Sequence, residues 1–391
     1  MRSIERLYFC RREGESKARA GHPALNFTKL SAGSARRVRK RMHGAFARPE
    51  RDGARMGRGI FQQKNTCDRG IFFVSTNILP VTDSPSSFLS MFSKPKLIII
   101  LGPTASGKSD LAVEVARRFG GEVVSADSRQ VYRGLDIGAG KITKREMHGI
   151  PHHLLDVANP RKQFSVAEYQ RLAVRAINDI VQRGKLPIIC GGTGFYIQSI
   201  TDNVVLPNVP PNTALREQLS KKTTEELFTI LTDLDPLYAK KVDAHNPVRL
   251  VRAIEIATAL GRVPSPTTTQ SPYDILQIGL TLPQSTLHKK IALRLKKRIR
   301  KGMIAEAKHL HKSGLSWKRM RTLGLEYRAL ADFLTGSITR AEMIESLATE
   351  IYRYAKRQMM WFKRDKRIIW FSPADATKIF TTVKKFLVIS T

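Results

Sequence analysis

Short apolar runs alternate with amphipathic stretches over the middle of the chain. Apolar runs occur in 96–101 (KLIIIL), 121–127 (GEVVSAD) and 184–197 (GKLPIICGGTGFYI), and each predicts a short buried strand. A helical pattern follows the first run and extends to about Phe119. Because strands that alternate with helices form parallel sheets covered on both faces, the pattern predicts an α/β fold.

Two capping boxes mark the starts of long helices. Ser165 and Glu168 have the Ser-x-x-Glu spacing that opens an amphipathic helix, and Thr339 and Glu342 form a second box near the C-terminus. The second helix is expected to continue to about Asp365.

The pattern changes at residue 204, after which helical segments with Pro-rich edges appear and no clear strand is evident up to 272. A strand returns at 277–283 (QIGLTLP), one long helical tract follows over 284–312, and 366–371 (KRIIWF) predicts a final strand. The predicted domains are a core formed by 91–203 plus 273–391 and a helical insertion at 204–272.

Residues 1–90 show little periodicity and contain an Arg- and Gly-rich stretch, a composition typical of disordered segments. We interpret them as a basic extension or as a misassigned start of translation, since Met91 lies just before the first predicted strand. An RNA-binding arm and a transit peptide are the alternatives. The acidic residues Glu5, Glu13 and Glu15 weaken the transit-peptide interpretation.

The chain is strongly basic, and this changes the expected partners. Its 391 residues include 67 Lys and Arg against 33 Asp and Glu, a formal net charge of +34. Such a charge favours a large polyanion, most simply a nucleic acid, with a generally basic protein kept soluble by its charge as the alternative. Eight Lys or Arg residues within 289–301, with no acidic residue among them, favour the polyanion.

Composition also excludes several classes of protein. No apolar run approaches the roughly 18–20 residues needed to span a bilayer, so no membrane partner is expected. The cysteines Cys10, Cys67 and Cys190 form no Cys-x-x-Cys pair, which argues against a disulfide framework or a zinc module. This cysteine usage fits a reducing compartment, and we expect a cytoplasmic protein.

The candidate chemistry begins with GPTASGKS, placed between the first predicted strand and a helix. In this phosphate cradle the glycines let backbone N–H groups point inward, the Lys supplies a point charge, and the Ser offers a hydroxyl to Mg²⁺. The loop is typical of nucleotide-binding and ATP-binding proteins, but what it recognises is a pyrophosphate-like group. The diphosphate-binding candidates are Gly102, Pro103, Thr104, Ala105, Ser106, Gly107, Lys108 and Ser109.

The usual partner of such a loop in nucleotide hydrolysis is missing. A Walker B strand ends in an Asp that holds Mg²⁺, whereas the strand LPIIC at 186–190 runs into GGTGFY. A hydrolytic motor or a GTPase is therefore disfavoured. An ATP-dependent small-molecule kinase remains open, because Asp127 follows another strand and could face the phosphates.

Three polar residues are candidates for catalysis at the strand ends, where ligands bind in such sheets. Asp127 is a general base or a water-mediated Mg²⁺ ligand, with a helix N-cap as the structural alternative. Thr193 either donates to a leaving-group oxygen or serves as a turn or N-cap residue. Arg294 flanks a stripe of apolar residues four apart, from which it could reach a cleft. Candidates for further polar contacts are Ser128, Arg129 and Gln130.

A family resemblance rests on seven stretches, which are GPTASGKS, SADSRQVYRGLDIGAGK, PHHLLD, GGTGFYI, LHKKIALRLKKRI, TLGLEYRAL and YAKRQMMWFKRD. In sequence and order they resemble the bacterial tRNA dimethylallyltransferases, also called tRNA isopentenyltransferases, over about 94–371. The resemblance implies a P-loop NTPase-like parallel sheet flanked by helices. It also implies transfer of a dimethylallyl group from dimethylallyl diphosphate to N6 of the adenosine at tRNA position 37, which is 3′ to the anticodon.

Residue roles follow from the same resemblance. It implies that Lys108 and the loop N–H groups bind the diphosphate, that Ser109 helps to hold Mg²⁺, and that Asp127 accepts the N6 proton. It further implies that Thr193 interacts with the bridging oxygen of the leaving group and that Arg294 lies near the diphosphate. The expected partners are dimethylallyl diphosphate and the anticodon stem-loop of tRNA, and we expect a monomer. The expected tRNA contacts are Asp127, Ser128, Arg129, Gln130, Val248, Arg249, Leu250, Val251 and Arg252, with the stretch 322–328 beside them.

The chain departs from the family pattern in its first 90 residues, which have no counterpart, and in Ser109, where many members have Thr. Either hydroxyl suits Mg²⁺. The cysteine pattern excludes the C-terminal zinc finger of eukaryotic members. The alternatives are the small-molecule kinase, a non-catalytic basic RNA-binding protein, and a relative that prenylates free AMP or ADP. The strong positive charge favours tRNA over a free nucleotide.

Overall fold

The computed structural model describes residues 94–265 and 267–388 of the chain. The predicted basic extension at 1–90 lies outside these described residues. All of the described residues belong to one compact unit, Ser84–Thr391. Within the described part, no helix is long and apolar enough to cross a membrane.

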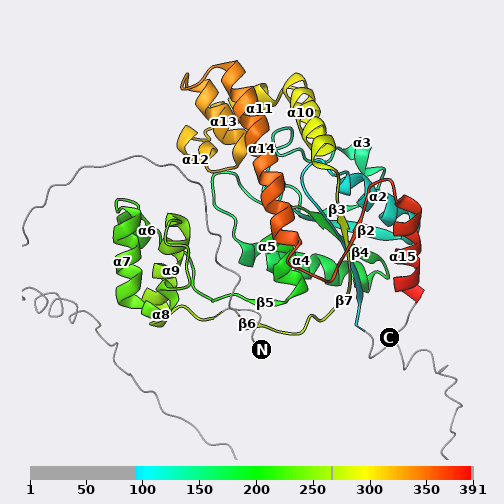
Figure 1. The fold of residues 1–391 in the computed structure, drawn as a ribbon, viewed down its shortest axis with the longest axis horizontal. Helices are drawn as coiled ribbons and strands as arrows, with labels where there is room; N and C mark the ends of the chain where they lie inside the picture. Colours follow the sequence, from blue (N-terminus) through cyan, green and yellow to red (C-terminus); the bar gives the residue numbers. More distant parts are fainter. Residues whose placement is uncertain (1–93, 266, 389–391) are drawn as a thin grey trace, which may run out of the picture. The chain divides into compact units, whose positions relative to one another are not determined.

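Six parallel strands form the main sheet, which confirms the predicted α/β fold (Figure 1). The strands are β1 (Lys96–Leu101), β2 (Gly121–Ala126), β3 (His152–His153), β4 (Leu186–Gly191), β7 (Asp274–Leu280) and β8 (Ile368–Phe371). They lie in the order β3-β2-β4-β1-β7-β8, with every neighbouring pair parallel. The central strand β1 is buried from Leu97 to Leu101, because helices cover both faces of the sheet.

The alternation of side chains along β1 separates the two covered faces. Ile98 and Ile100 pack against α2 (Lys108–Phe119) and α15 (Ala376–Val388). Ile99 packs on the opposite face, against α4 (Val166–Gln182) and α5 (Gly194–Thr201). In Figure 1, α15 accordingly lies on one side of the strands, and α4 and α5 lie on the other.

Both predicted capping boxes are formed. Ser165 Oγ accepts the Glu168 N–H at 3.2 Å while the Glu168 carboxylate accepts the Ser165 N–H at 2.8 Å, and α4 begins at the next residue. Thr339 and Glu342 make the same pair of bonds, at 3.3 and 2.7 Å, before α14 (Arg340–Phe362). Each box satisfies two backbone N–H groups that a helix start would otherwise leave unpaired.

A second group of helices surrounds a separate core. It consists of α10 (Gln284–Arg300), α11 (Met303–Lys312), α12 (Trp317–Arg321) and α13 (Leu325–Leu334), together with α14. The predicted stripe of apolar residues on α10 faces this core, where Leu287, Ile291 and Leu295 are buried. In Figure 1, α14 extends from this group down to α5, and it therefore connects the helical group with the sheet.

The chain between β5 (Val204–Val205) and β6 (Thr267–Thr268) is mostly helical. Its helices are α6 (Thr213–Leu219), α7 (Thr224–Leu234), α8 (Pro236–Ala239) and α9 (Pro247–Leu260). They pack around a core of their own that includes Leu231 and Leu250. The Asn246 side chain caps α9, and Pro247 occupies its first turn, where a missing N–H costs nothing.

Several details differ from the sequence-based expectations. The tract 284–312 is two helices, because Gly302 adopts a left-handed φ of +102° between α10 and α11. The strand expected at 277–283 already begins at Asp274. The segment 204–272, expected to lack strands, contains the short antiparallel pair β5–β6. The elements left without a prediction are β3, α12, α13, α15 and α3 (Lys144–Met147).

Candidate active site

The phosphate loop connects β1 to α2, and its backbone geometry explains its glycines. Gly102 and Gly107 have φ values of +152° and +92°, which L-residues rarely adopt. A Cβ at Gly102 would also lie 2.8 Å from the carbonyl oxygen of Leu280 in β7. Because α2 begins at Lys108, the N-terminus of the helix points its N–H groups at the loop.

The loop residues divide into those that face a cavity and those that support the loop. Thr104, Lys108 and Ser109 line the cavity. Ser106 is fully buried, and its hydroxyl has no hydrogen-bond partner among the described residues. The Pro103 carbonyl accepts from the Ser106 N–H and from Lys108 Nζ, at 3.3 and 3.2 Å, and it therefore closes the loop on itself.

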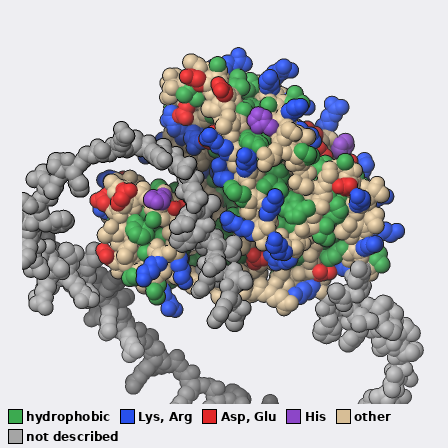
Figure 2. Space-filling view, in the orientation of Figure 1, with side chains coloured by type: hydrophobic (Ala, Val, Ile, Leu, Met, Phe, Trp, Pro, Cys, Tyr) green, Lys and Arg blue, Asp and Glu red, His purple; other side chains and the backbone are tan. Residues whose placement is uncertain are grey.

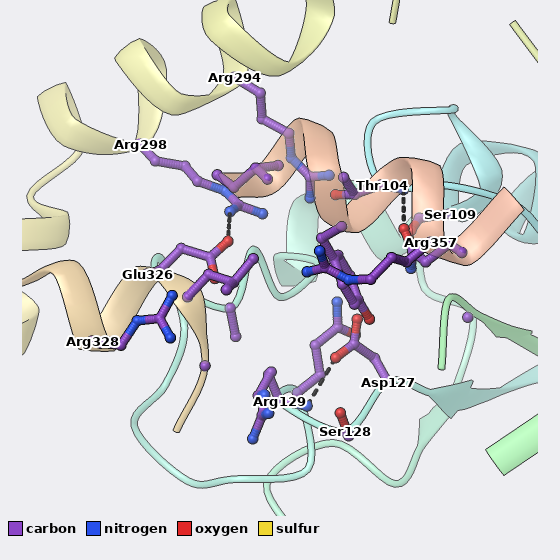
Figure 3. A pocket seen from close by; sticks show the side chains of 18 of the residues that line it. Thr104, Ser109, Asp127, Ser128, Arg129, Arg294, Arg298, Glu326, Arg328 and Arg357 are labelled. Atoms are coloured by element: carbon purple, nitrogen blue, oxygen red, sulfur yellow. Dashed lines mark hydrogen bonds and ion pairs between the residues drawn. The ribbon is translucent and has the colours of Figure 1, made fainter. Parts of the chain in front are cut away.

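The cavity has a volume of about 480 Å³ and lies at the carboxyl ends of β2 and β4. Figure 3 shows Arg294 and Arg298 extending from α10 toward the space that Asp127 also faces. The charged lining residues other than Lys108 are Arg129, Arg294, Arg298, Arg321, Arg328, Arg357, Asp127 and Glu326. Such an excess of cations in a concave site favours an anionic ligand.

Asp127 and Thr193 come from different strand ends, and the turn after β2 joins them. Asp127 Oδ1 accepts the Arg129 N–H at 2.8 Å, and the Ser128 N–H donates to Thr193 Oγ1 at 3.0 Å. No helix begins at Asp127, so the N-cap alternative for this residue is wrong. Asp127 Oδ2 has no hydrogen-bond partner within the described part of the chain, so this oxygen can accept a proton from a ligand.

Thr193 holds the N-cap position of α5, but its side chain makes no capping hydrogen bond. Its hydroxyl oxygen accepts the Ser128 N–H instead, which leaves the O–H able to donate to another oxygen. Thr193 is not itself among the residues that line the cavity, although Gly191 of the same strand end is. Its interaction with a leaving group stays a prediction.

Crowded cations give the site an unusual electrostatic character. Burial lowers the pKa of Lys108, and the neighbouring Arg294 and Arg298 lower it further, against the opposing effects of Cys190 and Asp127. Burial and the nearby Arg298 also lower the pKa of Arg294 to about 10. Because burial and mutual repulsion make the charged forms less favourable than they are in water, a bound polyanion would stabilise these cations.

Backbone carbonyls of the loop 138–140 orient the guanidinium groups of Arg294 and Arg298. Arg294 Nη2 donates to the Gly140 carbonyl and Arg298 Nη1 donates to the Gly138 carbonyl, both at 3.3 Å. A Cβ at Gly140 would overlap the Arg298 guanidinium and would lie 2.7 Å from Arg294 Nη2. Arg298 also pairs with Glu326 at 3.2 Å, as Figure 3 shows.

Glu306 of α11 holds the same loop from outside the cavity. Its carboxylate accepts the N–H groups of Asp136, Ile137 and Gly138 at 3.0, 2.6 and 2.9 Å. The Tyr327 hydroxyl donates to the same carboxylate at 2.6 Å. Four donors on one carboxylate fix the loop whose carbonyls orient Arg294 and Arg298.

A site with these parts can be compared with known proteins. The family model described as IPP transferase matches residues 130–365, more than half of the chain. The chain belongs to this family. The tRNA dimethylallyltransferase of Anoxybacillus flavithermus is 39% identical over 297 residues, which cover 75% of this chain and 95% of the relative. The tRNA dimethylallyltransferase 1 of Syntrophus aciditrophicus is 44% identical over 287 residues, 71% of this chain and 94% of the relative.

Solved structures agree with this assignment. The full-length tRNA isopentenylpyrophosphate transferase from Bacillus halodurans superposes with a TM-score of 0.58 and 36% identity, covering 75% of this chain and 97% of that chain. A eukaryotic dimethylallyltransferase structure reaches a TM-score of 0.63 at 24% identity over 75% of this chain and 78% of that chain. This second likeness supports the fold alone.

In this member of the IPP transferase family, the expected tRNA contacts fall into two groups. Ser128, Arg129 and Gln130 line the cavity beside Asp127, and the stretch 322–328 contributes Thr322, Gly324, Leu325, Glu326 and Arg328 to the same lining. The segment 248–252 lies on α9, and none of its residues is among those that line the cavity.

The residues of this α9 segment differ in what they present to solvent. Leu250 is fully buried in the core of the α6–α9 helices, so its side chain serves the packing of these helices. Arg252 pairs with Glu255 at 3.2 Å, whereas Val248 is 74% exposed. A contact of the segment as a whole with tRNA stays a prediction.

One side of the cavity was not predicted from the sequence. It is formed by a face of α14, along which the lining residues recur three or four positions apart. The sequence of this helix mixes aromatic and cationic residues in the stretch YAKRQMMWFKRD, which could have indicated a binding face. In the structure, Trp361 and Phe362 of this stretch pack in the core beside the sheet. The lining residues of this face are Ile351, Tyr354, Arg357 and Gln358.

Ion pairing separates the lining arginines into two kinds. Arg129, Arg294 and Arg357 have no carboxylate partner within 94–265 and 267–388, so their charges are available to a ligand. The paired ones are Arg298 with Glu326, Arg321 with Asp332 and Arg328 with Glu350.

Proposed function

We propose that this chain is a tRNA dimethylallyltransferase, which transfers a dimethylallyl group from dimethylallyl diphosphate to N6 of adenosine 37 of a tRNA. The products are N6-isopentenyladenosine and diphosphate. The observation that carries the proposal is the cavity, in which a phosphate loop and several arginines share one space with Asp127. Membership of the IPP transferase family and the names of the relatives support the same activity. A diphosphate leaving group needs no water activated against a γ-phosphate, and a Walker B Asp would have no task here.

The reaction replaces a C–O bond of the donor with a C–N bond to the base. As the diphosphate departs, it takes the electron pair of the C–O bond, and Lys108, Arg294 and the loop N–H groups stabilise the growing negative charge. Thr193 donates its O–H to the bridging oxygen. N6 supplies the electron pair of the new bond, and Asp127 accepts the N6 proton at Oδ2.

Mg²⁺ is the proposed cofactor, and the donors present fit it. Ser109 lines the cavity at the start of α2, and proteins commonly hold Mg²⁺ with one or two oxygens together with substrate phosphates. Across the described residues, no group of three His, Cys, Asp or Glu could hold a metal without substrate. When bound, the ion would supply positive charge to the leaving diphosphate.

The RNA substrate must present one unstacked base. Enzymes that modify a base move it out of the stack and into a pocket, and the cavity is where the adenine would meet Asp127. Arg129 and Arg357 would bind the phosphates on either side of this nucleotide. Lys and Arg side chains are spread widely over the face of the molecule drawn in Figure 2, as tRNA binding requires. We expect the chain to act as a monomer, in the cytoplasm where tRNA is used.

The test uses two anticodon stem-loop RNAs that differ only at position 37, one with adenosine and one with guanosine. Each is incubated with the protein, Mg²⁺ and dimethylallyl diphosphate, and its intact mass is measured. We expect one five-carbon adduct on the adenosine RNA and none on the guanosine RNA. An unmodified adenosine RNA with folded protein would refute the proposal, and phosphate transfer from ATP to a small acceptor would support a kinase instead.

A further inference from the structure

Gln358 is a buried polar residue of α14 whose amide joins two loops of the active site. Its Oε1 accepts the Thr104 N–H at 2.9 Å, and its Nε2 donates to the Gly192 carbonyl at 2.8 Å. Gln358 is only 6% exposed, so its own amide has little access to water and depends on these two partners. Thr104 belongs to the phosphate loop and Gly192 to the turn after β4. One side chain therefore connects the diphosphate cradle with the turn that leads into Thr193.

Close packing fixes the position of this amide. A Cβ at Gly192 would overlap Gln358 Nε2, and a Cβ at Gly194 would overlap the indole of Trp361. Neither glycine has a positive φ, so both are required by the approach of α14 rather than by turn conformation. The GGTG motif thus makes room for α14 at the end of β4.

The connection continues from Gly192 to the reacting residues. Thr193 follows Gly192 directly, and its Oγ1 accepts the Ser128 N–H at 3.0 Å. The next bond in the same turn runs from the Arg129 N–H to Asp127 Oδ1 at 2.8 Å. A shift of the Gly192 carbonyl would therefore move Thr193 and, through the Ser128 turn, Asp127.

We propose that Gln358 is a positioning residue for the prenyl transfer. Its amide sets the spacing between the phosphate loop, which holds the departing diphosphate, and the turn that carries Thr193 toward Asp127. The carboxamide suits this role because it offers an acceptor and a donor at a fixed separation. The inference rests on the proposed function for the reaction it serves, while the effect on diphosphate binding can be measured without that reaction.

The first test removes both hydrogen bonds with Gln358→Met, which keeps the length of the side chain. The matched control is Gln277→Met, because Gln277 is a second buried glutamine, 3% exposed, that donates to Asp365 at 3.0 Å and does not line the cavity. Both variants are compared at a temperature where circular dichroism shows them folded. We measure kcat with both substrates saturating, and the affinity for inorganic pyrophosphate by calorimetry.

Gln358→Met should lower kcat by about 10- to 100-fold, since small misplacements of reacting groups cost this much, and it should weaken pyrophosphate binding several-fold. Gln277→Met should leave both quantities within about twofold of wild type. Equal kcat and equal pyrophosphate affinity for the two folded variants would overturn the inference. If wild type binds pyrophosphate but transfers no prenyl group, the proposed function fails. The pyrophosphate affinities of the two variants then decide alone whether Gln358 positions the phosphate loop.

A second variant, Gln358→Glu, keeps the proposal testable if Gln358→Met does not fold. An ionised Glu still accepts from Thr104 but faces the Gly192 carbonyl with a second acceptor, whereas the protonated acid can donate to that carbonyl. At about pH 8, where the Glu is ionised, the kcat of Gln358→Glu should therefore lie about 10- to 100-fold below that of wild type. A ratio of the two kcat values close to one at this pH would overturn the inference.

Discussion

Gly140 offers the sharpest test of how the orientation of Arg294 and Arg298 affects diphosphate binding. Its backbone has φ +59°, and a Cβ there would overlap the Arg298 guanidinium and lie 2.7 Å from Arg294 Nη2. The substitution Gly140→Ala should therefore push both side chains away from the positions that the loop carbonyls give them. Neither arginine is itself changed, so the variant tests orientation rather than charge.

The expected magnitude follows from the contacts. Each arginine makes one bond to the loop, at 3.3 Å. Arg298 Nη1 also pairs with Glu326, and the N–H groups that make neither contact can be directed at a diphosphate. Losing one hydrogen bond to a charged group costs about 1.5–3 kcal/mol. This corresponds to about 10- to 150-fold weaker binding. We expect that loss in the calorimetric affinity for inorganic pyrophosphate and a parallel rise in KM for dimethylallyl diphosphate.

Gly149→Ala is the matched control for this experiment. Gly149 has a similar left-handed φ of +79°, but a Cβ there would meet nothing within 4 Å. Both variants carry the strain of an alanine in this region, about 1–2 kcal/mol, so both should lose similar stability. Pyrophosphate binding that is equally strong in Gly140→Ala and Gly149→Ala would show that the orientation of Arg294 and Arg298 does not matter for diphosphate binding, and it would refute the reasoning.

Three further predictions concern single residues. Asp127→Asn keeps an oxygen for the Arg129 N–H, and it should lower kcat by about 10²–10⁴-fold with pyrophosphate affinity unchanged; a loss of affinity alone would contradict the role as a base. Burial lowers the pKa of Lys108 from its usual 10.5, and a bound anion would raise it again. Pyrophosphate affinity should therefore be greatest below the lowered pKa and should begin to decline before the pH reaches 10.5. Calorimetry from about pH 7 to pH 10 would show a pH-independent affinity if this is wrong. The Arg183 guanidinium lowers the pKa of Glu122 to about 2, so the stability from this pair is present above the usual 4.5 and is lost as the pH falls toward 2. Urea unfolding should show Glu122→Gln less stable than wild type at pH 7, and the difference in free energy of unfolding should decrease as the pH is lowered. A difference that stays constant with pH would contradict this prediction.

The sheet and the phosphate loop could be predicted because their signals are local. The apolar run at 96–101 is buried from Leu97 to Leu101, and eight consecutive residues define the loop. The capping boxes are equally local, since their partners lie three residues apart. β3 has only two residues, which is too short for any periodicity, and so it gave no signal.

The far wall of the cavity could not be predicted because tertiary packing creates it. Gln358 contacts the phosphate loop, and Arg357 lines the cavity beside it, only because α14 packs on both the second helical core and α5. The sequence shows a helix with aromatics and cations, but not which face meets the ligand. The same limit applies to Leu250, where a segment carried over as an RNA contact includes a side chain that the insertion core needs.

The central claim is that the phosphate cradle holds a diphosphate that leaves, and not the phosphates of ATP. The most direct measurement quantifies pyrophosphate released and prenylated RNA formed in the same reaction, with dimethylallyl diphosphate or ATP as the only donor. The account predicts one pyrophosphate per prenylated adenosine with dimethylallyl diphosphate, and neither product with ATP. Phosphate or pyrophosphate release from ATP without any prenylated RNA from dimethylallyl diphosphate would contradict it.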